Sequence, residues 1–395
     1  MRFLNQVFAV TKLNILNLPK RIATSTVAII GVLAVVLVFA AVLSMAKGFE
    51  RTMMATGSDD VAIVLRSGAT SELTSGFSNE QTLIVGNAPG VVRDGDRPVA
   101  SAELFVVVDI RKRSNNKDAN VPFRGIQEGA FEVRDNTRLV AGRMFETGKN
   151  ELIVGHGVQQ EFVGLDVGDT IRFGRVDWQV VGLFEAGGGA AESEIWTDVR
   201  VLQDAYRRGT SYQSVRVRLE SPDSVEDLRE ALAGDPRLDV EVFSEKDYYA
   251  AQAEGLAQFI RLLGYPITFL MAIGAVFGAL NSMYASVSAR GTEIATLRAL
   301  GFGPFAVLVS TIIESTLLAL VGGLAGGALA FLVFNGFRVS TLSQGSFSQV
   351  VFDFAVTPDL LMQGVKVALI IGLIGGFLPA IRAARLPVAQ ALREL

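Results

Sequence analysis

The chain has 395 residues, half of them hydrophobic, with 40 glycines, one histidine and no cysteine. Its length allows two or three domains. The absence of cysteine excludes disulfides and thiol chemistry, and a single histidine, His156, cannot form a metal cluster alone, so we expect it to be structural. The formal net charge is −4, and it is not evenly spread. Residues 47–254 hold 24 basic and 35 acidic side chains, a net of −11, against +7 for the remainder.

Four apolar segments are long enough to cross a bilayer, which needs about 20 residues. Ile22 to Ala46 has 25 residues without a charge, 262–289 and 367–381 have none, and 305–334 has only Glu314. We therefore predict four transmembrane helices. The first is expected to be an uncleaved anchor, because its apolar core is too long for a signal peptide.

Residues 3–18, before the first span, have the pattern of an amphipathic helix at the inner membrane surface, which ends before Pro19 turns the chain inward. The alternative is a plain cytoplasmic extension of the first span. The apolar residues near helical spacing are Phe3, Leu4, Val7, Phe8 and Ile15.

The region between the first two spans is predicted to be a mixed α and β domain. From Ser214, the segments SVRVRL, SVEDLREALAG and LDVEVF predict strand, helix and strand, a β–α–β unit. Further strands are predicted at Val61–Leu65, Val99–Ile110, Val121–Gly125, Glu151–Val154, Thr170–Phe173, Trp178–Leu183 and Glu194–Trp196.

A long helix is predicted next. Ser244 to Asp247 (SEKD) resembles a helix N-cap with acidic first-turn residues, and only Pro266 interrupts the sequence up to Ala289. About 40 helical residues span roughly 60 Å, twice a bilayer core. The second span is therefore expected to project from the membrane as a rigid stalk.

Glycines are frequent in the spans, where small residues let helix backbones approach closely. They indicate a sliding or dimer interface or, alternatively, static packing within one bundle. The residues concerned are Gly274, Gly278, Gly322, Gly323, Gly326, Gly327, Gly372, Gly375 and Gly376.

The segment ARGTEIATLRALGFGPFAV, residues 289–307, lies between the second and third spans. Thr292 can cap a short helix, Gly301 can end it, and Pro304 can start the third span. Such a helix is either an interfacial helix lying on lipid or a plug for the groove of a cytoplasmic partner. Its apolar side carries Ile294, Leu297 and Leu300, and its charges are Arg290, Glu293 and Arg298.

Glu314 lies about ten residues, or 15 Å, from the cytoplasmic end of the third span. An acid within a membrane is costly and is a functional candidate by default. No basic partner is evident at matched depth, so a hydrogen bond to a neighbouring helix is favoured over contact with a substrate or a proton.

Lysine and arginine near the spans predict the orientation, because they accumulate on the cytoplasmic side. The short loop between the third and fourth spans has only Arg338, with Lys366 just inside the fourth. Both termini are therefore predicted on the cytoplasmic side of a bacterial inner membrane. The basic residues on that side are Arg2, Lys12, Lys20, Arg21, Arg290, Arg298, Arg382, Arg385 and Arg393.

No catalytic motif is evident. GRMFETGKN, residues 142–150, has five residues between its glycines, Asn150 where a hydroxyl side chain is needed, and no helix after it. It is rejected as a phosphate-binding loop. No nucleophile and base set is evident either, so the chain is not predicted to be an enzyme, nor to hold a metal or cofactor.

Three sets of motifs resemble ABC-transporter permeases of the MacB/FtsX type over nearly the whole chain. RGTEIATLRALG, residues 290–301, is similar to that family's cytoplasmic loop, close to R-x-x-E-I-A-x-L-R-A-L-G, and PAIRAARLPVAQALREL to its ending. Three further segments resemble the family's periplasmic core: LVAGRMFETGKNELIVG, FVGLDVGDTIRF and VDWQVVGLFEAGGGAAESEIWTD.

The resemblance implies a type VII, MacB-like architecture: an α-helical membrane protein with four transmembrane helices and a large α+β extracytoplasmic domain between helices one and two. It implies a permease homodimer above a dimer of a separate ATP-binding subunit, which binds ATP and Mg, since this chain lacks MacB's fused ATPase domain. The loop helix would enter an ATPase groove through Arg290, Glu293, Ile294, Leu297, Arg298, Leu300 and Gly301.

ATP-driven closure would then move the outer domain and expel or extract periplasmic or outer-leaflet substrates, a mechanism called mechanotransmission. A periplasmic adaptor, an outer-membrane channel and membrane lipid are the further partners expected, and no nucleic acid. The alternatives are FtsX-like signalling to a cell-wall hydrolase, for which an outer domain of about 200 residues is large, and lipoprotein extraction or sorting.

The expected boundaries are, in order, a cytoplasmic helix (1–21), the first span (22–46), the periplasmic core with stalk (47–254), the second span (255–289), the coupling helix (290–303), the third span (304–335), a short periplasmic loop (336–360), the fourth span (361–381) and a cytoplasmic tail (382–395).

Overall fold

The structure is a computed structural model that describes residues 2–17, 22–343 and 347–388. The chain divides into two compact units. The helical unit comprises Met1–Lys47, Phe259–Phe337 and Ala355–Leu395, and the sheet unit comprises Gly48–Gln258 and Arg338–Phe354. The expected turn at Pro19 and the basic residues Lys20, Arg21 and Arg393 lie outside the described residues.

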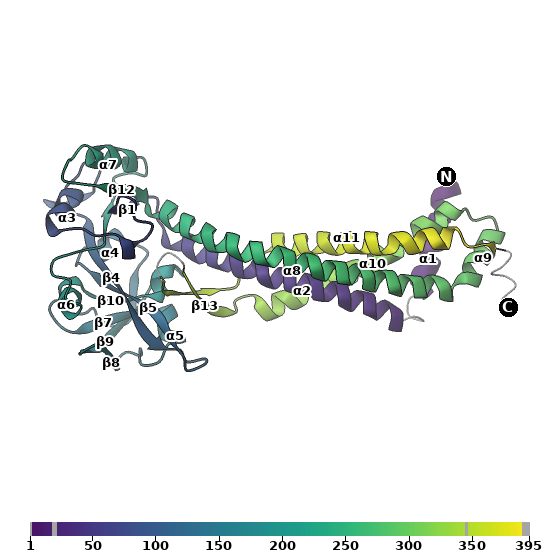
Figure 1. Ribbon diagram of the computed structural model, residues 1–395, viewed down its shortest axis with the longest axis horizontal. Coiled ribbons are helices and arrows are strands. Elements are labelled where there is room, and N and C mark those ends of the chain that lie inside the picture. Colours follow the sequence, from purple (N-terminus) through teal and green to yellow (C-terminus); the bar gives the residue numbers. More distant parts are fainter. Residues whose placement is uncertain (1, 18–21, 344–346, 389–395) are drawn as a thin grey trace. The chain divides into compact units, whose positions relative to one another are not determined.

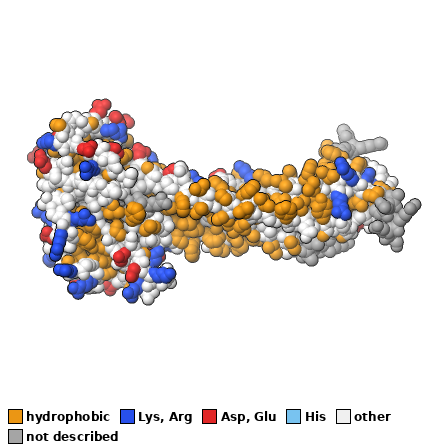
Figure 2. All heavy atoms as spheres, viewed as in Figure 1, with side chains coloured by type: hydrophobic (Ala, Val, Ile, Leu, Met, Phe, Trp, Pro, Cys, Tyr) orange, Lys and Arg blue, Asp and Glu red, His pale blue; other side chains and the backbone are white. Residues whose placement is uncertain are grey.

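The helical unit contains the four predicted spans. Four helices are long and apolar enough to cross a membrane, and hydrophobic side chains dominate their surface in Figure 2. Two of these helices also run into the sheet unit without a break. The helices (Figure 1) are α1 (Arg2–Asn17), α2 (Ile22–Thr56), α8 (Glu245–Ala289), α9 (Gly291–Ala299), α10 (Pro304–Phe334) and α11 (Pro358–Ala384).

The membrane glycines divide into packed and open positions. A Cβ on Gly322 would lie 2.7 Å from the carbonyl oxygen of Ile29 in α2, and one on Gly372 would lie 2.5 Å from the Cβ of Ala319 in α10. Apart from the neighbouring backbone of α8 itself, no heavy atom of the described chain lies within 4 Å of a Cβ on Gly274 or Gly278. Static packing therefore accounts for the close glycines of α10 and α11. These are Gly322, Gly323, Gly326, Gly372, Gly375 and Gly376.

The sheet unit is built on a ten-stranded sheet of order β12-β1-β11-β4-β5-β10-β7-β9-β6, with β8 paired to β9. The strands predicted from apolar alternation are all present, whereas β6 was not predicted. The sheet strands are β1 (Val61–Arg66), β4 (Ala100–Arg111), β5 (Asp118–Ile126), β6 (Arg138–Gly142), β7 (Glu151–Gly155), β8 (Thr170–Phe173), β9 (Val176–Glu185), β10 (Ile195–Asp198), β11 (Ser214–Arg218) and β12 (Val240–Ser244).

Short helices and a small hairpin complete this part of the chain. They are η2 (Glu72–Thr74), α3 (Asn79–Gly86), β2 (Arg93–Asp94), β3 (Arg97–Pro98), α4 (Ala130–Val133), α5 (His156–Glu161), η3 (Ala190–Ser193), α6 (Val199–Ala205) and α7 (Ser224–Ala233).

The predicted β–α–β unit is present as β11, α7 and β12. Both strands pair antiparallel with β1, one on each side of it. The two strands joined by α7 are therefore separated by β1, which comes from much earlier in the chain. α7 buries Leu228 and Leu232. After β12, the backbone N–H of Asp247 donates to Ser244 Oγ at 3.0 Å, which confirms the predicted cap of α8.

The expected short loop 336–360 contains a hairpin, β13 (Arg338–Leu342) and β14 (Gln349–Asp353), that belongs to the sheet unit. Lys112 Nζ donates to Ser340 Oγ at 2.6 Å, and the amide of Val351 donates to Ser193 Oγ at 2.8 Å. Phe352, only 3% exposed, packs edge to face against Phe49. The sheet unit is therefore assembled from two separate segments of chain.

Candidate functional site

Helix α9 is bounded by specific backbone signals. Arg290 occupies the N-cap position, Gly301 has a φ of +95°, and Pro304 begins α10. A left-handed glycine ends a helix, and proline fits the first position of the next one. The predicted end is thus confirmed, but Thr292 as the N-cap is wrong, because the helix already starts at Gly291.

One side of α9 is buried in the core of the helical unit. Ile294 is 4% exposed and clusters with Val287, Val307 and Ala383. This side chain is already packed within its own chain, and its expected role as an anchor for a partner protein stays a prediction. Leu297 lies half-buried beside it.

Arg298 is also used inside the unit. Its Nη1 donates to the carbonyl oxygens of Ala384 at 2.8 Å and Leu386 at 3.1 Å. The last carbonyls of a helix have no helical donor, and a basic side chain there also opposes the negative end of the helix dipole. Arg298 therefore caps α11, which joins α9 to the end of the fourth span.

The other side of α9 is open. Leu300 is 73% exposed, and Phe305, the second residue of α10, is 61% exposed. Thr292, Thr296 and Ala299 are exposed as well. Residues 292, 296 and 300 recur every four positions and so share one side of the helix. We call these five residues the α9 face.

Glu314 has a basic partner, contrary to the expectation from sequence. Arg290 Nη1 donates to Glu314 Oε2 at 2.8 Å, and the side chains are 7% and 5% exposed. Arg290 Nη2 donates to Asn14 Oδ1 in α1, and Asn14 Nδ2 donates to Ser310 Oγ at 2.8 Å. Thr11 Oγ1 lies 3.2 Å from the same hydroxyl. The long arginine side chain reaches the acid from the turn between α8 and α9.

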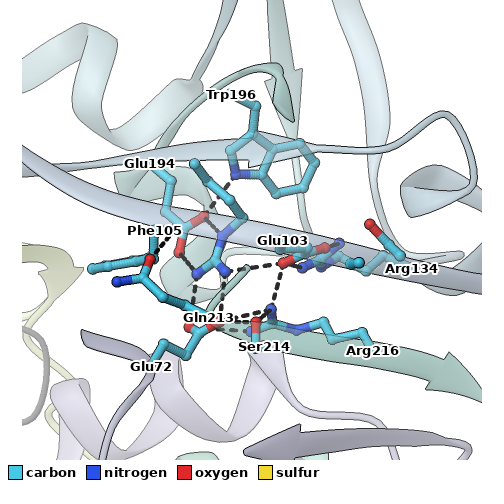
Figure 3. A network of polar contacts seen from close by, with 12 residues as sticks. Glu72, Glu103, Phe105, Arg134, Glu194, Trp196, Gln213, Ser214 and Arg216 are labelled. Atoms are coloured by element: carbon cyan, nitrogen blue, oxygen red, sulfur yellow. Dashed lines mark hydrogen bonds and ion pairs between the residues drawn. The ribbon is translucent and has the colours of Figure 1, made fainter. Parts of the chain in front are cut away.

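A second polar cluster lies inside the sheet unit (Figure 3). Arg124 donates to Glu72, Glu103 and Glu194, with distances from 2.6 to 2.9 Å. Trp196 Nε1 donates to Glu194 at 2.6 Å. This buried network was not predicted. Its charged members, all less than 9% exposed, are Glu72, Glu103, Glu194, Glu245, Arg124, Arg134 and Arg216.

The network includes the first turns of α8. Arg216 Nε donates to Glu245 Oε1 at 3.0 Å, and Arg216 Nη2 donates to the hydroxyl of Tyr249 at 3.2 Å. The same guanidinium also bonds Glu72 and Glu103. The start of α8 is therefore tied to β11, β4 and η2 by side chains as well as by the chain itself.

The electrostatics favour the charged forms of Glu103 and Glu72. Burial alone raises the pKa of Glu103, but attraction by Arg134, Arg216 and Arg124 outweighs it and brings the pKa to about 2. Burial likewise raises the pKa of Glu72, and Arg124 and Arg216 hold it well below its usual range. A buried charge is tolerated only when it is paired and hydrogen-bonded in this way.

In the segment rejected as a phosphate-binding loop, residues 142–150, a side chain and a backbone N–H are bonded to carboxylates of the chain itself. Arg143 makes a bidentate ion pair with Glu151, with both distances at 2.7 Å. This hydrogen bonding lowers the pKa of Glu151 to about 2. Gly148 N–H donates to Asp198 Oδ2 at 3.0 Å.

Across residues 2–17, 22–343 and 347–388 there is no cluster of acidic and histidine side chains suited to a metal.

Family comparisons cover both units. The model of the MacB-like periplasmic core domain matches residues 22–234, and that of the FtsX-like permease C-terminal domain matches residues 266–388. Over 73% of this chain, the sequence is 26% identical to the macrolide export ATP-binding/permease protein MacB of Pasteurella multocida, of which 45% is covered. The chain spans about half the length of the MacB proteins that it matches.

Two uncharacterized ABC transporter permeases match over larger shares of their own length. One, from Methanocaldococcus jannaschii, is 21% identical over 95% of this chain and 96% of its own. The other, YknZ of Bacillus subtilis, is 24% identical over 72% of each. The solved extracellular domain of YknZ covers 46% of this chain and 99% of that domain, at 18% identity and a TM-score of 0.36.

The two family models therefore account for the α+β domain between the first and second spans and for the spans that follow it. This chain is a multi-pass membrane protein and belongs to the MacB/FtsX family of ABC transporter permeases.

Proposed function

We propose that this chain is the permease subunit of an ATP-driven exporter, in which a separate ATP-binding subunit docks on the α9 face and moves the sheet unit. The observation that carries the proposal is the α9 face itself. Leu300 at the C-cap of α9 and Phe305 at the start of α10 are exposed, while the opposite side of α9 is packed. Exposed apolar side chains on a fixed helix are typical of a docking site.

The anchoring of α9 supports force transmission. Arg298 caps α11, and Arg290 bonds α1 and α10, so a displacement of α9 acts on several helices. α8 is 45 residues long, and its first part, 245–258, belongs to the sheet unit, where Glu245 joins the buried network. A helix of that length is about 67 Å long.

The remaining assignments follow from the same proposal. The basic ends of the spans favour cytoplasmic termini and an outward-facing sheet unit in a bacterial inner membrane. The open glycines, Gly274 and Gly278, favour a second permease copy against α8, since a small-residue face of this kind suits close helix packing. ATP and Mg would bind to the partner subunit, and expelled or extracted substrates would leave with the help of a periplasmic adaptor.

The test is co-purification of the tagged full-length chain from native membranes in mild detergent, comparing the wild type with Leu300→Asp. Burying a leucine contributes about 1.5–3 kcal/mol. Its replacement by aspartate should therefore reduce the recovered ATP-binding subunit at least about tenfold. Leu83→Asp is the matched control, because Leu83 is a 58% exposed leucine in the sheet unit.

If no ATP-binding subunit accompanies the wild type, the exporter proposal is wrong. If Leu300→Asp recovers as much of it as Leu83→Asp does, the α9 face is not the docking site. The other proteins in the wild-type eluate separate the pathways. An adaptor supports export, whereas a hydrolase activator supports the signalling alternative.

A further inference from the structure

The guanidinium of Arg290 has each of its three nitrogens on a different part of the helical unit. Nε donates to Glu293 of α9 at 3.4 Å, Nη1 donates to Glu314 of α10 at 2.8 Å, and Nη2 donates to Asn14 of α1. Arg290 itself follows the last residue of α8 and forms the N-cap of α9. One side chain therefore joins three helices at the corner where α8 becomes α9.

The surroundings of this side chain are closed. Arg290 is 5% exposed, Asn14 3% and Ser310 0%. Placing an arginine and a glutamate together beneath a membrane surface is costly unless both are paired and hydrogen-bonded. The cluster meets that condition, because Asn14 spans from Arg290 to the hydroxyl of Ser310.

The planar shape of the guanidinium explains why an arginine occupies this corner. Its donors point in fixed directions within one plane. A lysine ammonium at the same place would retain the charge opposite Glu314. It could not hold Asn14 in a defined direction at the same time.

We propose that Arg290 is a positioning residue that holds α1 and α10 to the base of α9, so that a partner's push on the α9 face moves the three helices as one body. The inference rests on the proposed function for the origin of the push. The contacts by which Arg290 clamps α1 and α10 to the base of α9 lie within this chain alone. α1 is then a part of the moving assembly, fixed by Asn14, as well as a helix at the membrane surface.

The absence of cysteine makes a direct test possible in the full-length chain. Thr11→Cys and Ser310→Cys replace two hydroxyls that lie 3.2 Å apart, on α1 and α10. The rate of disulfide formation between them, measured in membranes under a mild oxidant, reports how closely α1 is held to α10. In this background, Arg290→Met should slow the reaction at least about tenfold, the factor expected for one hydrogen bond to a charged group.

Three further variants make the result specific. Arg290→Lys should give an intermediate rate. The double exchange of Arg290→Glu with Glu314→Arg should restore much of the rate, since the amide of Asn14 can donate or accept. Glu293→Gln is the matched control, because its bond to Arg290 is long and Glu293 is half exposed. It should leave the rate within about twofold of the wild type.

With the ATP-binding subunit bound, addition of ATP should leave the wild-type rate unchanged, because α1 and α10 move together. Three results would each overturn the inference. The first is an unchanged rate of disulfide formation in Arg290→Met, and the second is a rate in the double charge exchange no faster than in Arg290→Met. The third is a wild-type rate that ATP alters severalfold. If Arg290→Met does not reach the membrane, Asn14→Ala decides in its place, because it keeps the ion pair between Arg290 and Glu314 and removes the bonds from α1 to Arg290 and to position 310. A failure to recover any ATP-binding subunit counts against the proposed function alone, since the resting rates still test the clamp.

Discussion

Replacement of Arg216 by methionine tests the buried network of the sheet unit most directly. Arg216 is 0% exposed and forms ion pairs with Glu72, Glu103 and Glu245. Methionine has a similar apolar stem but no donor. The substitution therefore leaves three buried carboxylates with fewer partners, while the space within the fold stays largely filled.

The expected loss of stability is large. The network has four carboxylates and three guanidiniums, so removal of Arg216 changes its formal charge from −1 to −2. Breaking one buried ion pair while leaving the other charge in place costs about 3–5 kcal/mol. With a urea dependence of about 2–3 kcal/mol per molar, the unfolding midpoint should fall by about 1–2 M.

The measurement can be made on the full-length chain in detergent by tryptophan fluorescence. The chain has two tryptophans. Trp178 and Trp196 both lie in the sheet unit and are 0% exposed. Fluorescence during a urea titration therefore follows the unfolding of this unit without a signal from the spans.

Arg97→Met is the matched control, since Arg97 pairs with Glu132 at the surface, where both side chains are nearly half exposed. Such pairs contribute at most about 1 kcal/mol. If Arg216→Met shifts the midpoint no more than Arg97→Met, the carboxylates have found other partners or lost their charge at little cost. The argument that the network is held by charge balance would then be refuted.

Three other outcomes are expected. The pKa of Glu103 is depressed to about 2 in the folded chain. Its contribution to the free energy of unfolding is therefore complete above the unfolded pKa, about 4.3, and is lost as pH falls towards 2. Urea unfolding midpoints measured at pH 7 and pH 3 should show the decrease. Gly372→Ala should destabilise the helical unit, since its Cβ meets Ala319 at 2.5 Å, whereas Gly278→Ala should be neutral for a single chain; heating in detergent followed by gel filtration compares them. Phe352→Ala should cost about 3–5 kcal/mol in the sheet unit and expose the β13–β14 hairpin to limited proteolysis.

Much of the fold follows from local sequence pattern. The spans are recognisable from uncharged length alone, and the strands of the sheet unit from alternation of apolar side chains. The β13–β14 hairpin was not recognised because its strands are short and RVSTL is largely polar. Its place beside Ser193 and Phe49 is a long-range contact that no local pattern encodes.

The polar sites were harder to predict, for two physical reasons. Alternation in a strand identifies two faces, and this pattern alone assigns charged residues such as Arg124 and Arg216 to the solvent-exposed face. In the structure these arginines are buried and meet carboxylates from elements that are distant in the sequence, Glu72 of η2 and Glu103 of β4. Similarly, the apolar side of α9 was recognised from its spacing. Spacing alone could not show that Ile294 packs within the chain while Leu300 stays open.

The two-segment construction of the sheet unit matters for any attempt to isolate it. A fragment of residues 48–258 would lack Arg338–Phe354. It would leave Phe49 without its aromatic neighbour, and Ser193 and Lys112 without their partners on the hairpin. An apolar strip opened in this way favours self-association. A soluble version should instead carry 338–354 on a linker after Gln258, so that the surface remains covered.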